Sequence, residues 1–127
     1  LSSDGLDEGE SPEGQVEGVL DSLGHAWIRY FIRHDPAPVL EKIRCPVLAV
    51  NGSLDLQVPW EDNLGAIESA LARGANPDYT VQAFEGQNHL FQRCETGAIE
   101  EYGQIEETFS LEVLEVLSSW ILARAAN

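Results

Sequence analysis

The hydrophobic pattern of the chain centres on two short apolar runs that one amphipathic segment separates. The first run, residues 46–50, reads Pro-Val-Leu-Ala-Val and ends at Asn51-Gly52, which is typical of a short buried strand that closes in a turn. The second run, residues 79–84, alternates loosely between apolar and polar residues, as a strand nearer the edge of a sheet does. The pattern therefore predicts a strand–helix–strand unit with parallel strands.

Helical spacing of apolar residues predicts the other elements. A helix over residues 60–73 joins the two strands, and Gly74 is expected to end it in the left-handed conformation. The clearest helix begins after Ser110, and residues 90–108 before it read as a long loop or a broken helix. Shorter helical segments are predicted at residues 16–27, 27–32 and 36–43.

The chain divides into three parts. Residues 1–14 contain almost no apolar side chain, so burial cannot offset their ordering entropy and we expect a flexible acidic lead-in. Residues 15–43 form a helical connector, and residues 44–127 hold the two strands and the last helix. At 127 residues, the length allows one domain at most.

The charge of the chain excludes one large class of partner. Seven basic and 22 acidic residues give a formal net charge of −15, which repels nucleic-acid phosphates and anionic lipid heads. No apolar stretch reaches the roughly 18 residues that a membrane span needs. No basic region followed by an apolar run predicts a signal peptide within the given residues. We expect a soluble protein with neither a nucleic-acid partner nor a membrane span. The acidity is most simply a solubility device, and a high-salt or extracellular habitat is the alternative. The compartment stays open, with a secreted or periplasmic parent protein as one interpretation.

Cysteine and histidine positions argue against a disulfide and against a metal site. Cys45 precedes the first strand and Cys94 follows the second. A strand of about five residues spans roughly 17 Å, whereas the Cα atoms of a disulfide lie roughly 4.4–6.8 Å apart. Both thiols are therefore expected to be free. The three histidines show no metal-ligand spacing with the cysteines, so we predict no metal and no other cofactor, and His25 and His34 are assigned surface or packing roles.

Asp55 and His89 are the candidate site residues because each follows a predicted strand. The carboxyl ends of parallel strands meet at the edge of the sheet where ligand chemistry gathers. A carboxylate there accepts a hydrogen bond from one ring nitrogen of a histidine, fixes its tautomer and leaves the other nitrogen free to take a proton. Taken alone, Asp55 is more simply a turn residue and His89 a surface or core residue. Their joint placement favours two members of a catalytic triad.

The third member of such a triad is missing from the sequence. A serine nucleophile commonly lies in a G-x-S-x-G turn between a strand and a helix. None of the serines has these flanking glycines, and neither cysteine lies in an equivalent turn.

Several short motifs agree in order and spacing with one known superfamily. They are Asp35-Pro36, Leu40-Glu41-Lys42-Ile43, Cys45-Pro46-Val47-Leu48-Ala49, Asn51-Gly52, Asp55-Leu56-Gln57-Val58, Asn63-Leu64, Asn88-His89-Leu90-Phe91-Gln92, Thr96-Gly97 and Glu107-Thr108-Phe109. Together they resemble the carboxyl-terminal part of an α/β-hydrolase. Within that superfamily, residues 24–122 are most similar to bacterial esterases related to the serine aminopeptidases.

The resemblance implies an α/β fold, namely the last two parallel strands and flanking helices of a doubly wound hydrolase sheet. Residues 15–43 would then be the remnant of a helical cap. It further implies that Asp55 is the triad acid and His89 the general base, while the serine precedes Leu1. The implied reaction is hydrolysis of a small-molecule ester, thioester or amide through an acyl-serine intermediate, and the 127-residue chain alone is expected to be inactive. Substrate contacts are assigned to Trp27, Phe31, Leu90 and Phe91.

Two alternatives stay open. The chain could be a non-catalytic binding or assembly module, or part of a haloalkane- or epoxide-type hydrolase with a carboxylate nucleophile. A parallel strand pair is normally buried on both faces, so the isolated chain is expected to have marginal stability. Its expected macromolecular partner is the upstream half of the hydrolase domain, or a second copy bound through the exposed sheet.

Overall fold

The structure is a computed structural model that describes residues 18, 21 and 23–125. The chain divides into two compact units, Leu1–Asp35 and Pro36–Asn127. The lead-in expected at residues 1–14 lies outside the described residues, and so do residues 16, 17, 19, 20 and 22 of the helix expected at residues 16–27.

Helix α2 (Ala26–Arg33) is the main described element of the first unit. Trp27 and Phe31 are one helical turn apart, and their ring centroids lie 6.3 Å from each other. Both side chains are about two-thirds exposed, at 66% and 69%. The predicted helix at residues 27–32 is therefore confirmed, with an exposed aromatic side.

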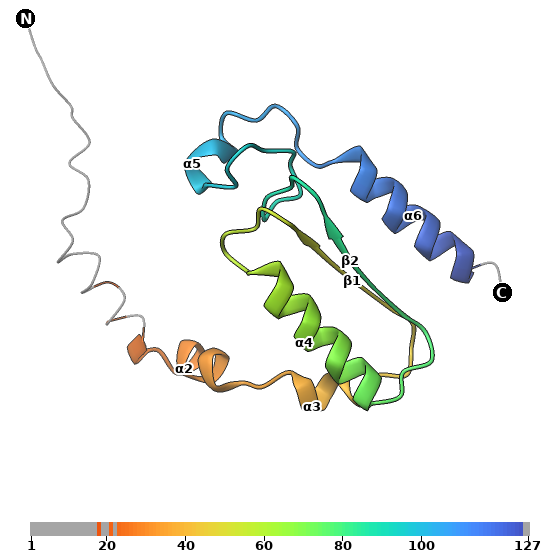
Figure 1. Ribbon diagram of the computed structural model, residues 1–127. Coiled ribbons are helices and arrows are strands. Elements are labelled where there is room, and N and C mark those ends of the chain that lie inside the picture. The colour runs from red at the N-terminus through yellow and green to blue at the C-terminus, as the bar shows by residue number, and fades with distance from the viewer. Residues whose placement is uncertain (1–17, 19–20, 22, 126–127) are drawn as a thin grey trace, which may run out of the picture. The chain divides into compact units, whose positions relative to one another are not determined.

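The second unit contains a two-stranded parallel sheet, which confirms the predicted strand–helix–strand arrangement (Figure 1). Its register runs from Val47 opposite Tyr79 to Gly52 opposite Phe84. The elements of this unit in chain order are α3 (Ala37–Leu40), β1 (Val47–Gly52), α4 (Trp60–Arg73), β2 (Tyr79–Phe84), α5 (Ile99–Tyr102) and α6 (Leu111–Ala125).

Helices α4 and α6 lie on the two sides of the sheet (Figure 1). Asn63 of α4 donates a hydrogen bond to Asn51 of β1, whereas the indole N–H of Trp120 in α6 donates to the Thr80 hydroxyl of β2 at 3.1 Å. Successive strand residues point to opposite faces, and the register places Asn51 and Thr80 on opposite faces. The buried apolar side chains are Leu64, Ala70, Leu71, Phe84 and Val113.

The end of α4 corrects one expectation from the sequence. The helix ends at Arg73 as predicted, but Gly74 has a φ of −73°, and Ala75 takes the left-handed conformation with a φ of 54°. Gly74 is instead required by close packing, because a Cβ atom there would collide with the backbone of Glu41, which follows α3. The chain therefore turns one residue later than the glycine suggests.

A polar cluster fixes the amino end of the strand pair. Arg124 of α6 makes two parallel hydrogen bonds to the carboxylate of Asp78, at 2.7 Å from Nε and 2.6 Å from Nη2. Its guanidinium also lies 3.8 Å from the centroid of the Trp120 ring. The Asn76 amide donates to the carbonyls of Ile43 and Cys45 at 3.0 and 3.1 Å. These contacts tie the chain entering β1 and helix α6 to the start of β2.

The two cysteines are free, as expected from their positions at opposite ends of the strands. No helix in the described part of the chain is long and apolar enough to span a membrane.

Candidate functional site

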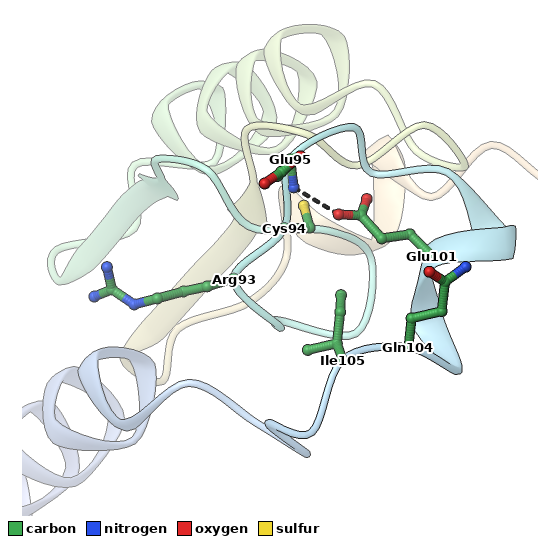
Figure 2. A pocket seen from close by; sticks show the side chains of 6 residues that line it. All are labelled: Arg93, Cys94, Glu95, Glu101, Gln104 and Ile105. Carbon is green, nitrogen blue, oxygen red and sulfur yellow. Dashed lines mark hydrogen bonds between the residues drawn. The ribbon is translucent and has the colours of Figure 1, made fainter.

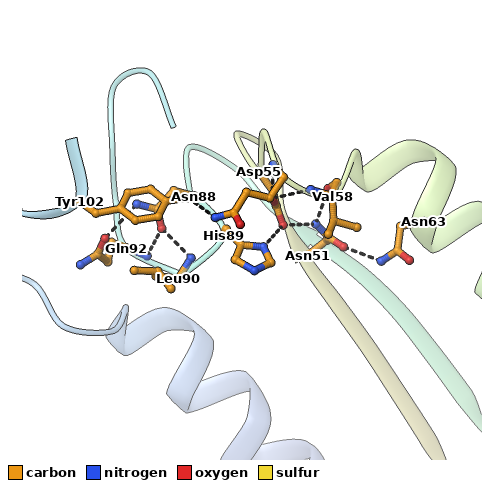
Figure 3. A network of polar contacts seen from close by, with 10 residues as sticks. Asn51, Asp55, Val58, Asn63, Asn88, His89, Leu90, Gln92 and Tyr102 are labelled. Carbon is orange, nitrogen blue, oxygen red and sulfur yellow. Dashed lines mark hydrogen bonds and ion pairs between the residues drawn. The ribbon is translucent and has the colours of Figure 1, made fainter. Parts of the chain in front are cut away.

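Asp55 and His89 lie together at the carboxyl end of the strand pair. Asp55 follows the turn after β1, and His89 lies five residues beyond the end of β2. The carboxylate Oδ2 of Asp55 is 2.9 Å from Nδ1 of His89 (Figure 3). Because parallel strands deliver both following loops to one edge, residues 34 positions apart form a direct hydrogen bond.

The Asp55 carboxylate is buried and receives hydrogen bonds on both oxygens. Its Oδ1 accepts from the backbone N–H groups of Gln57 at 3.0 Å and Val58 at 2.9 Å, and its Oδ2 accepts from the Asn51 amide at 3.0 Å. Burial by itself would raise the pKa of Asp55, but the hydrogen bonds from His89, Val58 and Gln57 outweigh it and hold the pKa below its usual value. Asp55 is therefore an anion at neutral pH.

His89 combines a fixed ring nitrogen with an accessible one. Its side chain is 38% exposed, against 5% for the side chain of Asp55. An ionised carboxylate can only accept a hydrogen bond, so Nδ1 is the donor and Nε2 of the neutral ring is left as a proton acceptor. A hollow of about 190 Å³ adjoins the pair. It is lined by Val50, Asn51, Asp55, Val58, Asn63, His89 and Phe91.

The loop that carries His89 is held by a buried amide network (Figure 3). Asn88 is fully buried, and its Oδ1 accepts from the backbone N–H groups of Leu90 at 2.9 Å and Gln92 at 3.0 Å. Its Nδ2 donates to Oε1 of Gln92 at 2.9 Å. The Gln92 amide then donates to the Glu107 carbonyl at 3.0 Å. Each bond shapes the turn on the C-terminal side of His89.

Two backbone features also fix the position of His89. A Cβ atom at Gly52 would collide with the carbonyl oxygens of Gln87 and Asn88, so glycine is required where β1 meets the His89 loop. Phe91 has a φ of 57°, which an ordinary side chain rarely adopts. Its ring packs against Phe84, with the centroids 6.1 Å apart. Strain of this kind, of order 1–3 kcal/mol, persists where the surrounding packing imposes it.

The segment around α5 braces the loop of Asp55 from the other side. The Gln57 amide donates to the Tyr102 hydroxyl at 3.1 Å. Gly97, with a φ of 76°, packs so closely on the Leu54 carbonyl that a Cβ atom would collide with it. The Glu101 carboxylate accepts from the Thr96 hydroxyl and from the N–H groups of residues 95–97, and these bonds lower its pKa from 4.5 to about 2.

Cys94 lies in a separate pocket of about 540 Å³ beside Glu101 (Figure 2). Burial, and then the negative charge of Glu101, raise the pKa of the Cys94 thiol. The thiol is therefore protonated at neutral pH and is a poor nucleophile. Across the described residues that line the hollow beside His89, there is no serine and no cysteine.

The structure brings together three of the six site residues expected from the sequence, namely Asp55, His89 and Phe91. Leu90 is 44% exposed and is not among the residues that line the hollow beside His89. Trp27 and Phe31 belong to the first unit, so their predicted contact with substrate stays a prediction.

Sequence reasoning missed Asn51 and Asn63 as members of the site. The sequence pattern places Asn51 in an Asn-Gly turn, whereas in the structure Asn51 lies within β1 and is only 5% exposed. An amide buried at the end of an apolar strand needs partners, and that requirement was the available signal. Asn63, at the start of α4, carries no such signal in the sequence.

The chain has no detectable similarity to known protein families, curated proteins or solved structures: no protein-family model, no curated protein and no solved structure matches it.

In the parts of the chain that the structure describes, no group of three or more His, Cys, Asp or Glu side chains could hold a metal ion.

Proposed function

We propose that the chain supplies the acid and the general base of a serine hydrolase, with the serine provided by a part of the protein outside this sequence. The Asp55–His89 hydrogen bond of 2.9 Å carries the proposal. It joins a buried carboxylate with a lowered pKa to an imidazole that faces a hollow. The resemblance to esterases favours a small-molecule carboxylic ester as substrate, with thioesters and amides next.

The pair would act in two proton transfers. Nε2 of His89 accepts the proton of the serine hydroxyl as its oxygen attacks the ester carbonyl carbon, and the Asp55 carboxylate stabilises the imidazolium that forms. The imidazolium then gives this proton to the alkoxide leaving group, which departs as the alcohol and leaves an acyl-serine. Water repeats the sequence, releasing the carboxylic acid and restoring the serine.

Exposed apolar side chains favour a second candidate, an assembly module. Leu111, Ile121 and Leu122 of α6 are 71%, 56% and 67% exposed. Each strand of the described two-stranded sheet also has one unpaired edge, and parallel sheets are normally covered on both faces. The upstream half of a hydrolase domain, or a second copy of the chain, would cover these surfaces.

Hydrolysis of p-nitrophenyl butyrate tests the first candidate. The rate is measured for the 127-residue chain and for the protein that includes the preceding residues of its own reading frame. We expect hydrolysis only by the longer protein, its loss in His89→Ala and its retention in His34→Ala, the matched control. Hydrolysis that survives His89→Ala would remove the general base.

The longer protein also separates the alternatives. A serine in a G-x-S-x-G turn upstream supports the serine hydrolase, whereas an aspartate at the same place supports a carboxylate nucleophile. A longer protein without either turn and without hydrolysis would reject the hydrolase and support the assembly module.

A further inference from the structure

The side-chain amide of Asn51 is fully engaged beside the Asp55–His89 pair (Figure 3). Its Nδ2 donates to Oδ2 of Asp55 at 3.0 Å and to the Val58 carbonyl at 3.2 Å. Its Oδ1 accepts from Nδ2 of Asn63 at 2.7 Å. Both amide hydrogens and the amide oxygen of this buried side chain therefore have partners.

Asn51 acts on the same carboxylate oxygen that His89 uses. Oδ2 of Asp55 accepts from both residues, while Oδ1 is held by two backbone N–H groups. The bond from Asn51 therefore opposes rotation of the carboxylate about its Cβ–Cγ bond. A rotated carboxylate would point Oδ2 away from Nδ1, and the ring would lose the contact that selects its tautomer.

Asn63 and the Val58 carbonyl together determine which way the Asn51 amide faces. An amide can present either its oxygen or its nitrogen to a neighbour, and an oxygen facing Asp55 would repel the carboxylate. The hydrogen bond from Asn63 can form only when Oδ1 of Asn51 faces α4, which leaves Nδ2 facing Asp55. The start of α4 is thus linked to the acid through two amides.

We propose that Asn51, oriented by Asn63, is a positioning residue for the Asp55–His89 pair. It aims Oδ2 of Asp55 at Nδ1 of His89 and so maintains the tautomer whose Nε2 accepts a proton. The catalytic meaning of this role rests on the proposed function. The hydrogen-bond geometry and its test do not require a nucleophile.

Asn76 provides a matched control at the opposite end of the strands. It is also a buried asparagine, 7% exposed, whose Nδ2 donates to two carbonyls and whose Oδ1 accepts from the backbone N–H of Asp78 at 3.0 Å. Replacing either asparagine by leucine removes a buried amide of the same size. Only Asn51 contacts Asp55.

The experiment reads the tautomer of His89 from the ¹⁵N chemical shifts of histidine-labelled protein. It uses the 127-residue chain and, in parallel, the longer protein, and His89→Ala assigns the signals. We expect neutral His89 to carry its proton on Nδ1. In Asn51→Leu the signal should shift toward the tautomer mixture of an unconstrained histidine, in Asn63→Ala it should shift less, and in Asn76→Leu it should not shift.

Folding is checked by circular dichroism on each variant. If Asn51→Leu does not fold, Asn63→Ala decides, because it leaves Asn51 in place and removes only the hydrogen bond to Oδ1 of Asn51. An unchanged tautomer in the folded variants, or an equal shift in Asn76→Leu, would overturn the proposal.

Ester hydrolysis by the longer protein gives an independent reading. Misplaced catalytic groups cost up to about 100-fold, so we expect Asn51→Leu to lower kcat by about 10- to 100-fold and to change KM by less than about twofold. A tautomer shift without any hydrolysis would reject the proposed function and keep the role of Asn51. Hydrolysis that is lost in His89→Ala but unchanged in Asn51→Leu would keep the proposed function and reject the role of Asn51.

Discussion

The two ends of the strand pair each hold an aspartate, and the comparison separates a structural ion pair from a candidate catalytic hydrogen bond. At the amino end, Asp78 pairs with Arg124. At the carboxyl end, Asp55 pairs with His89. Hydrogen bonding to Arg124 lowers the pKa of Asp78, and the pKa of Asp55 is lowered although burial opposes it. Both carboxyl groups are therefore ionised at neutral pH.

The partners differ in whether they can release a proton. The Arg124 guanidinium stays protonated at every pH at which proteins fold, so its pair with Asp78 can only hold α6 to the start of β2. An imidazole, by contrast, can accept a proton on one ring nitrogen and release it again, as general bases in catalysis do. A lowered carboxyl pKa thus marks the presence of a partner, whereas chemistry also requires a partner that titrates and an open nitrogen beside a hollow.

The largest difference between the ends is expected in hydrolysis by the longer protein. Asp55→Asn keeps the shape but loses the charge and allows the wrong tautomer, so we expect kcat to fall by about 10⁴-fold. Asp78→Asn is the matched substitution at the other end and should change kcat by less than about twofold, because it touches no reacting group. The p-nitrophenyl butyrate assay measures both. Similar losses in the two variants would mean that Asp55 only supports the fold.

Two glycines give the next largest expected effect. A Cβ atom at Gly52 would collide with the His89 loop, and one at Gly74 would collide with Glu41. Overpacking of this kind costs about 1–3 kcal/mol, so both alanine substitutions should lower the free energy of unfolding in urea. Only Gly52→Ala should also shift the His89 tautomer. Gly65→Ala, in α4 with open space around its Cβ position, serves as the control and should not destabilise.

An unperturbed His89 tautomer in folded Gly52→Ala would mean that the β1–loop contact does not position the base. A tautomer shift in Gly74→Ala would mean that the two ends are coupled.

The sequence predicts those features of the two ends that depend on local patterns of apolar and polar residues. The apolar run before Asn51 indicates β1, the spacing after Ser110 indicates α6, and both are confirmed. The direct contact of Asp55 with His89 follows from parallel strands, which deliver their following loops to one edge.

Other features depend on tertiary contacts and leave no periodic trace in the sequence. The amide of Asn63 reaches Asn51 only because α4 begins beside the end of β1. Gly74 is needed for its packing against Glu41, so its presence in the sequence does not mark the left-handed residue. Orientations of buried amides are set by partners that are distant along the chain.

Both aspartates should contribute to the loss of stability in acid. Each has a folded-state pKa below its unfolded value of about 3.9. Each therefore contributes stability that is present above about pH 3.9 and is lost as the pH falls through the folded-state pKa. Asp78→Asn and Asp55→Asn should each reduce the loss of stability on acidification, measured as the urea midpoint at pH 6 and pH 3.

Salt sharpens this prediction. The side chain of Asp78 is 39% exposed and that of Asp55 is 5% exposed, and about 1 M salt reduces the screening length to about 3 Å. We expect salt to remove most of the difference between the native chain and Asp78→Asn, and little of the difference between the native chain and Asp55→Asn. Equal salt dependence of the two variants would contradict the assigned burial.

The smallest expected effect concerns the two thiols, which also lie at opposite ends of the strands. Burial raises the pKa of Cys94, and the Glu101 charge raises it further, while Cys45 is exposed and distant from that carboxylate along the chain. Glu101→Gln removes the charge, so the Cys94 thiolate fraction should rise. Alkylation by iodoacetamide at pH 8, followed by mass spectrometry of the two peptides, should be severalfold faster at Cys94 and unchanged at Cys45. Equal acceleration at both thiols would instead indicate general loosening of the fold, because a local charge effect cannot reach the far end of the strands.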